Sequence, residues 1–97
     1  MISLPPQYTR VGILSTREYE ILLKIGEGLR TSRIASDLDI STRTVSAHYC
    51  NMILKLGLQG GIHQMRVLAI SYRLWAQENG VRRIYRGLFT TEPLPAA

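Results

Sequence analysis

Apolar residues in the middle of the chain recur every three or four positions, and short turn signals separate one such block from the next. The clearest block begins at Ser41 and ends at Gly57. Its apolar members are Val45, Tyr49, Met52, Ile53 and Leu56. This spacing follows the 3.6-residue period of a helix and not the two-residue period of a strand. Because Ser41 can cap a helix and Gly57 can stop one, the block predicts an amphipathic helix.

Another helix is expected earlier in the chain. Ser15 and Glu18 stand at capping-box spacing, so each side chain can accept a hydrogen bond from a backbone N–H that the first turn leaves unpaired. The residues expected on its buried face are Leu14, Ile21, Leu22, Ile25 and Leu29. Gly28 is placed to end this helix in a left-handed conformation.

A short helix follows, capped by Thr31 or Ser32, and a tight turn over residues 39–41 joins it to the amphipathic helix. Its expected buried residues are Ile34, Ala35 and Leu38. Ala35 offers the small side chain that two closely crossing helices need, and Ile40 can fill the gap between them. A short helix, a turn and a second amphipathic helix are typical of the helix-turn-helix units that read DNA. An ordinary helical hairpin would show the same spacing, so the apolar pattern alone leaves both interpretations open.

Charge gives a weaker indication of the partner. The 97 residues carry a formal net charge of +5, so polyanions attract the chain through a field that salt weakens. This favours nucleic acid as a partner but does not prove it, because many basic domains bind none. The length suffices for one modest core, so we expect a single domain with short tails.

Other classes of function find little support in the sequence. No apolar run is long enough to span a membrane, and the N-terminus lacks the features of a signal peptide, so a reducing, cytoplasmic setting is expected. Cys50 is the single cysteine, which leaves no disulfide and no thiol pair for a metal. Cys50 and His48 point to different sides of the expected helix, which denies the thiol an adjacent base. We therefore expect no enzyme, no catalytic residue, no metal and no cofactor.

The segment from residue 14 to residue 75 also carries spaced residues in a fixed order. They are Leu14, Ser15, Arg17, Glu18, Glu20, Ile21, Leu22, Glu27, Gly28, Leu29, Ile34, Ala35, Leu38, Ile40, Ser41, Arg43, Thr44, Val45, His48, Asn51, Lys55, Leu56, Gly57 and Leu58. In these residues the segment resembles the LuxR/FixJ (GerE-type) helix-turn-helix family. The resemblance implies an all-α fold of four helices, with the third in the major groove of DNA and the fourth used in dimerisation. We expect an irregular lead-in over residues 1–13, the helix-turn-helix domain over 14–76 and a partly disordered C-terminal extension over 77–97.

The resemblance also implies which residues contact DNA. Where the family usually presents Lys or Arg on the third helix, this chain has Ser46, Ala47 and Cys50, so strong arginine–guanine contacts are not expected there. Serine can still hydrogen-bond base edges, and the alanine methyl can contact a thymine methyl. Phosphate anchoring then falls to the starts of the second and third helices and to the end of the third. The full expected set is Ser32, Arg33, Thr42, Arg43, Thr44, Ser46, Ala47, Cys50, Asn51 and Lys55.

The last long helix, expected over residues 62–76, has two apolar faces. The face expected to close the core holds Ile62, Met65, Ala69, Tyr72 and Ala76. On the opposite side Val67, Ile70 and Leu74 fall together at i, i+3 and i+7. A lone helix on a small domain turns one face to water, so this second stripe needs a partner. The candidates are another copy of the chain, which makes these three residues a dimerisation site, and the C-terminal tail.

The tail begins at Gln77, and Gly80 is expected to end the helix. Beyond it, arginines alternate with apolar residues, namely Arg82, Arg83, Ile84, Tyr85, Arg86, Leu88 and Phe89. This spacing is compatible with an appended helix that covers Val67, Ile70 and Leu74, with a basic arm that reaches DNA, and with a disordered end. The appended helix is preferred, because it would cover aromatic and aliphatic side chains.

Two functional hypotheses follow. The first is a sequence-specific transcription regulator that binds double-stranded DNA as a homodimer on two half-sites. The second is a protein-interaction module of the anti-activator type, which keeps the fold but binds another transcription regulator. The lack of basic residues at positions 46, 47 and 50 keeps the second hypothesis open, and the first is preferred.

Overall fold

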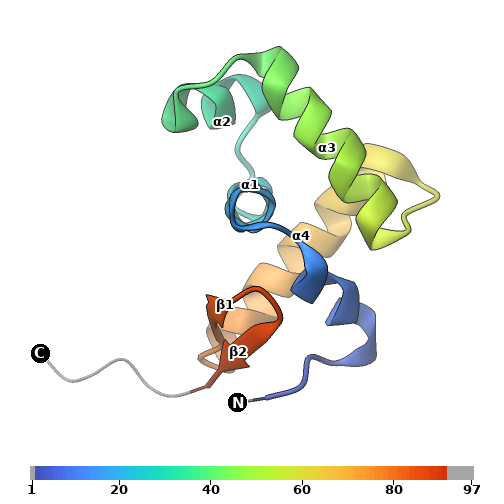
Figure 1. The fold of residues 1–97 in the computed structure, drawn as a ribbon, viewed down its shortest axis with the longest axis vertical. Coiled ribbons are helices and arrows are strands. Elements are labelled where there is room, and N and C mark those ends of the chain that lie inside the picture. The colour runs from blue at the N-terminus through green and yellow to red at the C-terminus, as the bar shows by residue number, and fades with distance from the viewer. Residues whose placement is uncertain (1, 92–97) are drawn as a thin grey trace, which may run out of the picture.

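The computed structural model describes residues 2–91, which form a set of helices followed by a small hairpin (Figure 1). The elements are the 3₁₀ helix η1 (Pro6–Ile13), the helices α1 (Thr16–Gly26), α2 (Thr31–Leu38), α3 (Thr42–Leu56) and α4 (Gly61–Glu78), and the strands β1 (Arg82–Tyr85) and β2 (Leu88–Thr90). The four predicted α-helices are present, and the predicted all-α helix-turn-helix fold is confirmed. None of the helices in this part of the chain is both long and apolar enough to cross a membrane.

Helix α1 begins and ends as the sequence predicts. Ser15 Oγ accepts a hydrogen bond from the Glu18 N–H (3.1 Å), and the Glu18 carboxylate accepts one from the Ser15 N–H (2.8 Å), which completes the capping box. At the other end, Gly28 has a φ of 86° and donates its N–H to the Ile25 carbonyl (2.9 Å). This left-handed residue satisfies a carbonyl that the last helical turn leaves unpaired.

The start of α2 differs from the prediction. Its N-cap residue is Arg30, and the predicted cap by Thr31 or Ser32 is wrong, because both lie inside the first turn. The Thr31 hydroxyl instead donates to the Tyr49 hydroxyl on α3 (3.3 Å). A residue expected to cap α2 therefore ties α2 to α3.

The turn between α2 and α3 is as tight as predicted. Asp39 adopts the left-handed conformation with a φ of 55°, which aspartate tolerates better than most residues do. The Ile40 N–H donates to the Ala35 carbonyl (3.0 Å). Ala35 is buried and Ile40 packs against the core, which confirms the close helix crossing predicted from these two residues.

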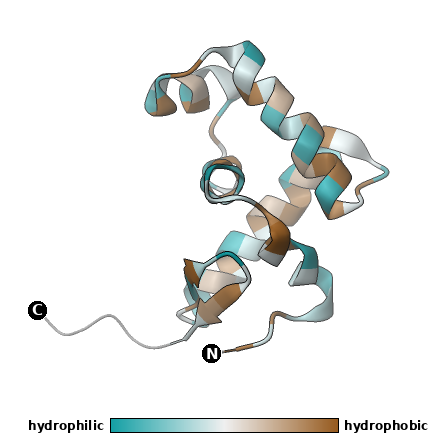
Figure 2. Cartoon of the chain, viewed as in Figure 1, coloured by the Kyte–Doolittle hydropathy of each residue, from teal (hydrophilic) through white to brown (hydrophobic). Residues whose placement is uncertain are grey.

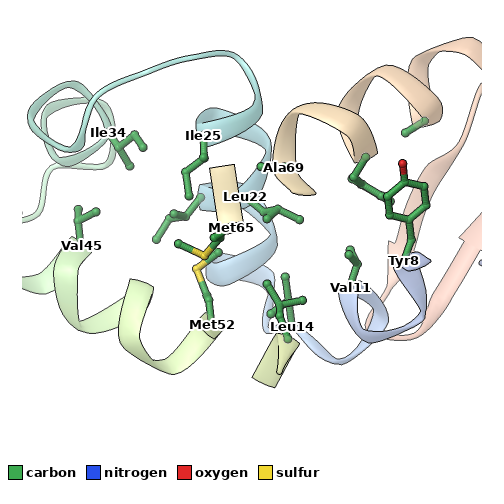
Figure 3. Close-up of a cluster of buried hydrophobic side chains, with 14 of the residues drawn as sticks. Tyr8, Val11, Leu14, Leu22, Ile25, Ile34, Val45, Met52, Met65 and Ala69 are labelled. Atoms are coloured by element: carbon green, nitrogen blue, oxygen red, sulfur yellow. The ribbon is translucent and has the colours of Figure 1, made fainter. Parts of the chain in front are cut away.

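The core lies where α1, α3 and α4 meet, and α2 and η1 extend it. Figure 3 shows Leu22, Met52 and Met65 gathered at its centre, one from each of the three main helices, and all three are fully buried. The buried residues of α4 are Met65, Ala69, Tyr72 and Ala76, as predicted, whereas Ile62, also predicted on this face, is half-buried. Hydrophobic and hydrophilic residues alternate with the turns of each helix (Figure 2), as expected for elements with one buried face.

Residues 1–13, predicted to be irregular, contain the 3₁₀ helix η1. Pro6 begins it, and proline suits a first helical position because the N–H that it lacks would be unpaired there anyway. Tyr8 and Val11 are buried, and the Tyr8 ring packs edge-on against the Tyr72 ring with centroids 5.3 Å apart. The lead-in is therefore part of the core, held by contacts with α4.

In the C-terminal extension, residues 82–90 form a β-hairpin, so the preferred prediction of an appended helix is wrong. Strands β1 and β2 are antiparallel, with Arg83 opposite Phe89, and Gly87 in the turn has a φ of 80°. On its other side β2 pairs with Ile2 through a single bridge. Phe89 is 2% exposed, so the hairpin contributes to the core.

The hairpin leaves the outer face of α4 uncovered. Val67, Ile70 and Leu74 are 57%, 45% and 50% exposed, which confirms that this stripe lies opposite the core face. Helix α4 runs to Glu78, slightly past its predicted end, and Gly80 with a φ of 62° follows it as expected. The prediction of a disordered end concerns residues 92–97, which lie outside the described residues.

Candidate nucleic-acid interface

Helix α3 turns one face away from the core. Its buried residues are Val45, Met52 and Leu56. Its exposed residues are Thr42, Arg43, Thr44, Ser46, Ala47, Cys50, Asn51 and Leu54. At an advance of ~100° per residue, Arg43, Ala47 and Cys50 lie along the middle of the side opposite the buried stripe. We call this exposed set the outward face of α3, and it brings the predicted third-helix residues together except Lys55.

Sequence reasoning did not select Leu54 as part of this face. Leu54 is 78% exposed and stands four residues after Cys50, so it prolongs the line through the middle of the outward face. The signal that could have identified Leu54 is its position outside the apolar stripe of the helix. The outward face is therefore less polar toward the C-terminal end of α3 than the prediction implied.

The start of α3 is fixed by Ser41. Its Oγ accepts a hydrogen bond from the Thr44 N–H (3.0 Å) and lies 2.9 Å from the Thr44 hydroxyl oxygen. The predicted cap is confirmed, and the Thr44 hydroxyl is engaged with it. The exposed guanidinium of Arg43 has no hydrogen-bond or ion-pair partner within residues 2–91, so it is available to an external anion.

The start of α2 lies beside the first half of α3 (Figure 1) and exposes Ser32 and Arg33. The Arg33 Nε donates to the Asp37 carboxylate (2.9 Å), although the Arg33 side chain is 68% exposed. This bond, with help from the nearby Lys24, lowers the pKa of Asp37 below its usual value. Arg33 is thus oriented by its own helix while its remaining donors face solvent.

Two further arginines near the start of α2 were missed by sequence reasoning. Arg30 and Arg66 line a hollow of about 520 Å³ together with Thr31 and Ser32. Both arginines are exposed, and neither guanidinium group has a hydrogen-bond or ion-pair partner among residues 2–91. The position of Arg30 directly before α2 was a usable signal, whereas Arg66 stands on α4 and only the fold brings it here.

Lys55, predicted to contact phosphate, is engaged inside the domain. Its Nζ donates to Glu18 Oε1 (2.7 Å), and the two side chains are 34% and 5% exposed. Burial by itself would raise the pKa of Glu18, but hydrogen bonds from Lys55 and Ser15 outweigh this and lower the pKa below its usual value. Lys55 therefore joins the last turn of α3 to the first turn of α1, and its predicted phosphate contact stays a prediction.

Part of the chain is similar in sequence to known bacterial regulatory proteins. Residues 12–68 match the LuxR family of bacterial regulatory proteins, which confirms the resemblance seen in the sequence. The transcriptional regulatory protein FixJ of Rhizobium meliloti (strain 1021) is 40% identical over 58 residues, which are 60% of this chain and 28% of FixJ. The oxygen regulatory protein NreC of Staphylococcus aureus (strain JH9) is 47% identical over 47 residues, which are 48% of this chain and 22% of NreC. No solved structure matches the chain.

The chain thus spans less than a third of the length of these curated relatives. The matched segment includes α1, α2, α3 and the first part of α4, whereas the hairpin lies beyond it. Because residues 12–68 make up more than half of the 97 residues, the protein belongs to the LuxR family of bacterial regulatory proteins.

Proposed function

We propose that this domain binds double-stranded DNA as part of a transcription regulator, with the outward face of α3 in the major groove. The observation that carries the proposal is that face itself, a line of exposed small and polar side chains on a helix whose opposite side is locked in the core. The major groove of B-DNA is wide enough to admit one α-helix. Membership of a family of regulatory proteins supports the same function.

The proposed base contacts come from the middle of α3. Ser46 and Asn51 supply hydrogen-bonding groups, and the methyl group of Ala47 can contact a thymine methyl. Cys50 and Leu54 add exposed side chains without a strong donor. Because these side chains are short or apolar, α3 has to approach the base edges closely, and the shape of the groove contributes to specificity.

The proposed phosphate contacts come from helix starts, where backbone N–H groups and basic side chains face the same anion. They are Ser32, Arg33, Thr42, Arg43 and Thr44. Arg43 is the strongest of them, because its guanidinium is exposed and has no partner within residues 2–91. Lys55 is left out of this set, because its ammonium is already bonded to Glu18.

The same proposal includes self-association through the outer stripe of α4. Val67, Ile70 and Leu74 are each about half exposed and are not covered by the hairpin. Exposed apolar side chains grouped in this way favour a protein partner. Two copies joined through α4 would place two copies of α3 on half-sites about one helical turn of DNA apart.

The test is selection of binding sites from random duplexes with the full chain, followed by salt titration of the selected site. Arg43→Ala should weaken binding to all sequences and reduce the slope of log affinity against log salt by roughly one. Arg17→Ala is the matched control, since it removes the same charge from α1, where Arg17 pairs with Glu20 (3.3 Å), and its slope should not change. If no motif is selected and no duplex binds, the interaction-module hypothesis replaces this proposal.

A further inference from the structure

A groove separates helix α1 from strand β1. It consists of two hollows of about 400 and 180 Å³, and Tyr19 and Arg83 line both of them. The other apolar residues that line it are Leu23, Ala76, Val81, Ile84 and Tyr85. We call it the α1–β1 groove. The hairpin and the start of α3 lie at opposite ends of the molecule (Figure 1), so the groove is separate from the proposed DNA interface.

Positive charge gathers along this groove. Arg73, Arg82 and Arg83 line its larger hollow, and Glu27 is the one acidic residue among the described residues that line it. The guanidinium groups of Arg73 and Arg82 have no hydrogen-bond or ion-pair partner within residues 2–91. Guanidinium groups placed together repel one another, so an anionic ligand would both relieve the repulsion and supply charge-assisted hydrogen bonds.

Arg83 holds the two walls of the groove in place. Its guanidinium donates to the Leu14 and Ser15 carbonyls and lies 4.8 Å from the centroid of the Tyr19 ring. These contacts fix β1 against the start of α1. The groove is therefore formed before any ligand arrives, which lowers the entropic cost of binding.

In the described part of the chain, no strand lies beside the edge of β1 that borders the groove. Within residues 2–91 the sheet consists of β1 and β2, and β2 has the Ile2 bridge on its other side. Both hollows are lined by residues of β1 and by none of β2, so the unpaired edge is the one that faces them. Among the described residues, no hydrogen bond joins the main chain of this edge to another element. An open strand edge of this kind is a template for an added strand.

We propose that the α1–β1 groove binds an extended acidic peptide of a partner protein, which adds to the edge of β1 as a third strand. The main chain of the peptide bonds to β1, and its carboxylates contact Arg73 and Arg82. Aliphatic side chains at alternate positions pack against Tyr19 and Leu23, because successive residues of a strand point to opposite faces.

Two other occupants fit the groove less well. A second copy of the chain would bring two β1 edges together and set Arg82 and Arg83 of both copies opposite one another, which is destabilising. Duplex DNA offers anions, but it has neither an extended chain to pair with β1 nor side chains to cover Tyr19 and Leu23. The acidic peptide satisfies the charge, the strand edge and the apolar lining together.

The experiment begins with selection from a displayed library of random peptides, with the full chain as bait. The selected peptides should alternate Asp or Glu with aliphatic residues. In fluorescence anisotropy, Arg73→Ala combined with Arg82→Ala should weaken the binding of a selected peptide by roughly tenfold or more. Arg17→Ala is the control and should bind it as the unchanged protein does.

Two further measurements locate the peptide without altering the protein. N-methylation of alternate peptide amides should weaken binding, because it removes the donors that a strand needs. Amide resonances of residues 81–85 should shift when the unlabelled peptide is added. The proposal is overturned if no acidic peptide is selected, if the double variant binds as well as the unchanged protein, or if the shifts fall on α3. Displacement of the peptide by duplex DNA would likewise overturn it.

Discussion

Replacing Lys55 by methionine should destabilise the domain, because it leaves the Glu18 carboxylate buried without its ammonium partner. The Glu18 side chain is 5% exposed and accepts hydrogen bonds from Lys55 Nζ (2.7 Å) and the Ser15 N–H (2.8 Å). Methionine keeps most of the unbranched stem that packs along the surface but cannot donate to the carboxylate. One of the two bonds is therefore lost while the charge stays buried.

The size of the effect follows from the burial of the pair. A hydrogen bond to a charged group contributes about 1.5–3 kcal/mol, and removing one partner of a fully buried pair costs about 3–5 kcal/mol. Because Lys55 is 34% exposed, water reaches the pair and the lower range applies. We expect Lys55→Met to reduce the free energy of unfolding by about 2 kcal/mol at neutral pH. The control Glu20→Gln breaks a pair whose side chains are 44% and 49% exposed, and it should cost less than about 0.5 kcal/mol.

The dependence on pH separates this explanation from a loss of packing. The pKa of Glu18 in the folded protein lies below its usual value of 4.5, so its ionised form stabilises the fold above that value, and this contribution is lost as pH falls through the folded pKa. In Lys55→Met the hydrogen bond from Lys55 no longer opposes the burial that raises the pKa of Glu18. The loss of unfolding free energy relative to the unchanged protein is therefore largest at neutral pH and smaller in acid. Urea titrations at pH 7 and pH 3.5, followed by circular dichroism, measure this. An equal deficit at both pH values would refute the reasoning.

Three other substitutions test separate parts of the structure. Ala47→Lys should change the half-site selected from random duplexes more than it changes non-specific affinity, because the residue lies in the middle of the outward face of α3; an unchanged motif would count against α3 as the reading helix. Ile70→Glu should keep the circular dichroism spectrum and abolish self-association in sedimentation, since it puts an unpaired charge in the proposed interface; a folded variant that still dimerises would remove this stripe from the interface. Phe89→Ala should lower the free energy of unfolding, measured in urea, by about 3–4 kcal/mol, because the side chain is 2% exposed. A loss below about 1 kcal/mol would show that the hairpin does not contribute to the core.

The features that the sequence predicted correctly are helix starts and ends, which depend on residues close together in the chain. The capping box of Ser15 and Glu18, the cap at Ser41 and the left-handed Gly28 all depend on residues a few positions apart. Their geometry is therefore readable from spacing alone. The start of α2 shows the limit of this reasoning, because Arg30 takes the cap position without any side-chain hydrogen bond to announce it.

The elements that sequence reasoning missed are held by distant contacts. Helix η1 is fixed by the packing of Tyr8 against Tyr72, which no local pattern encodes. In the tail, the alternation of arginine and apolar residues suits either a helix or a strand. Gly87, between Tyr85 and Leu88, was the signal that favours a hairpin turn.

The candidate site was predictable in its helical part only. The period of α3 sufficed to place Ser46, Ala47 and Cys50 on one exposed face. The bond between Lys55 and Glu18 joins helices that are far apart in the sequence, so spacing could not show that this lysine is engaged. Spacing likewise could not show that Arg66 of α4 lines the hollow at the start of α2.

The hairpin also determines the order in which the domain can be completed. Arg86 donates two hydrogen bonds to the Ile13 carbonyl, and the Ile2 N–H donates to the Phe89 carbonyl (3.1 Å). These contacts close a loop that contains all four α-helices, and we expect such long-range closure to form late in folding. During synthesis Phe89 leaves the ribosome after all four α-helices. Ile2 and Ile13 therefore cannot form their hydrogen bonds to the hairpin until the helices have been made. The hairpin thus fixes the residues that precede α1.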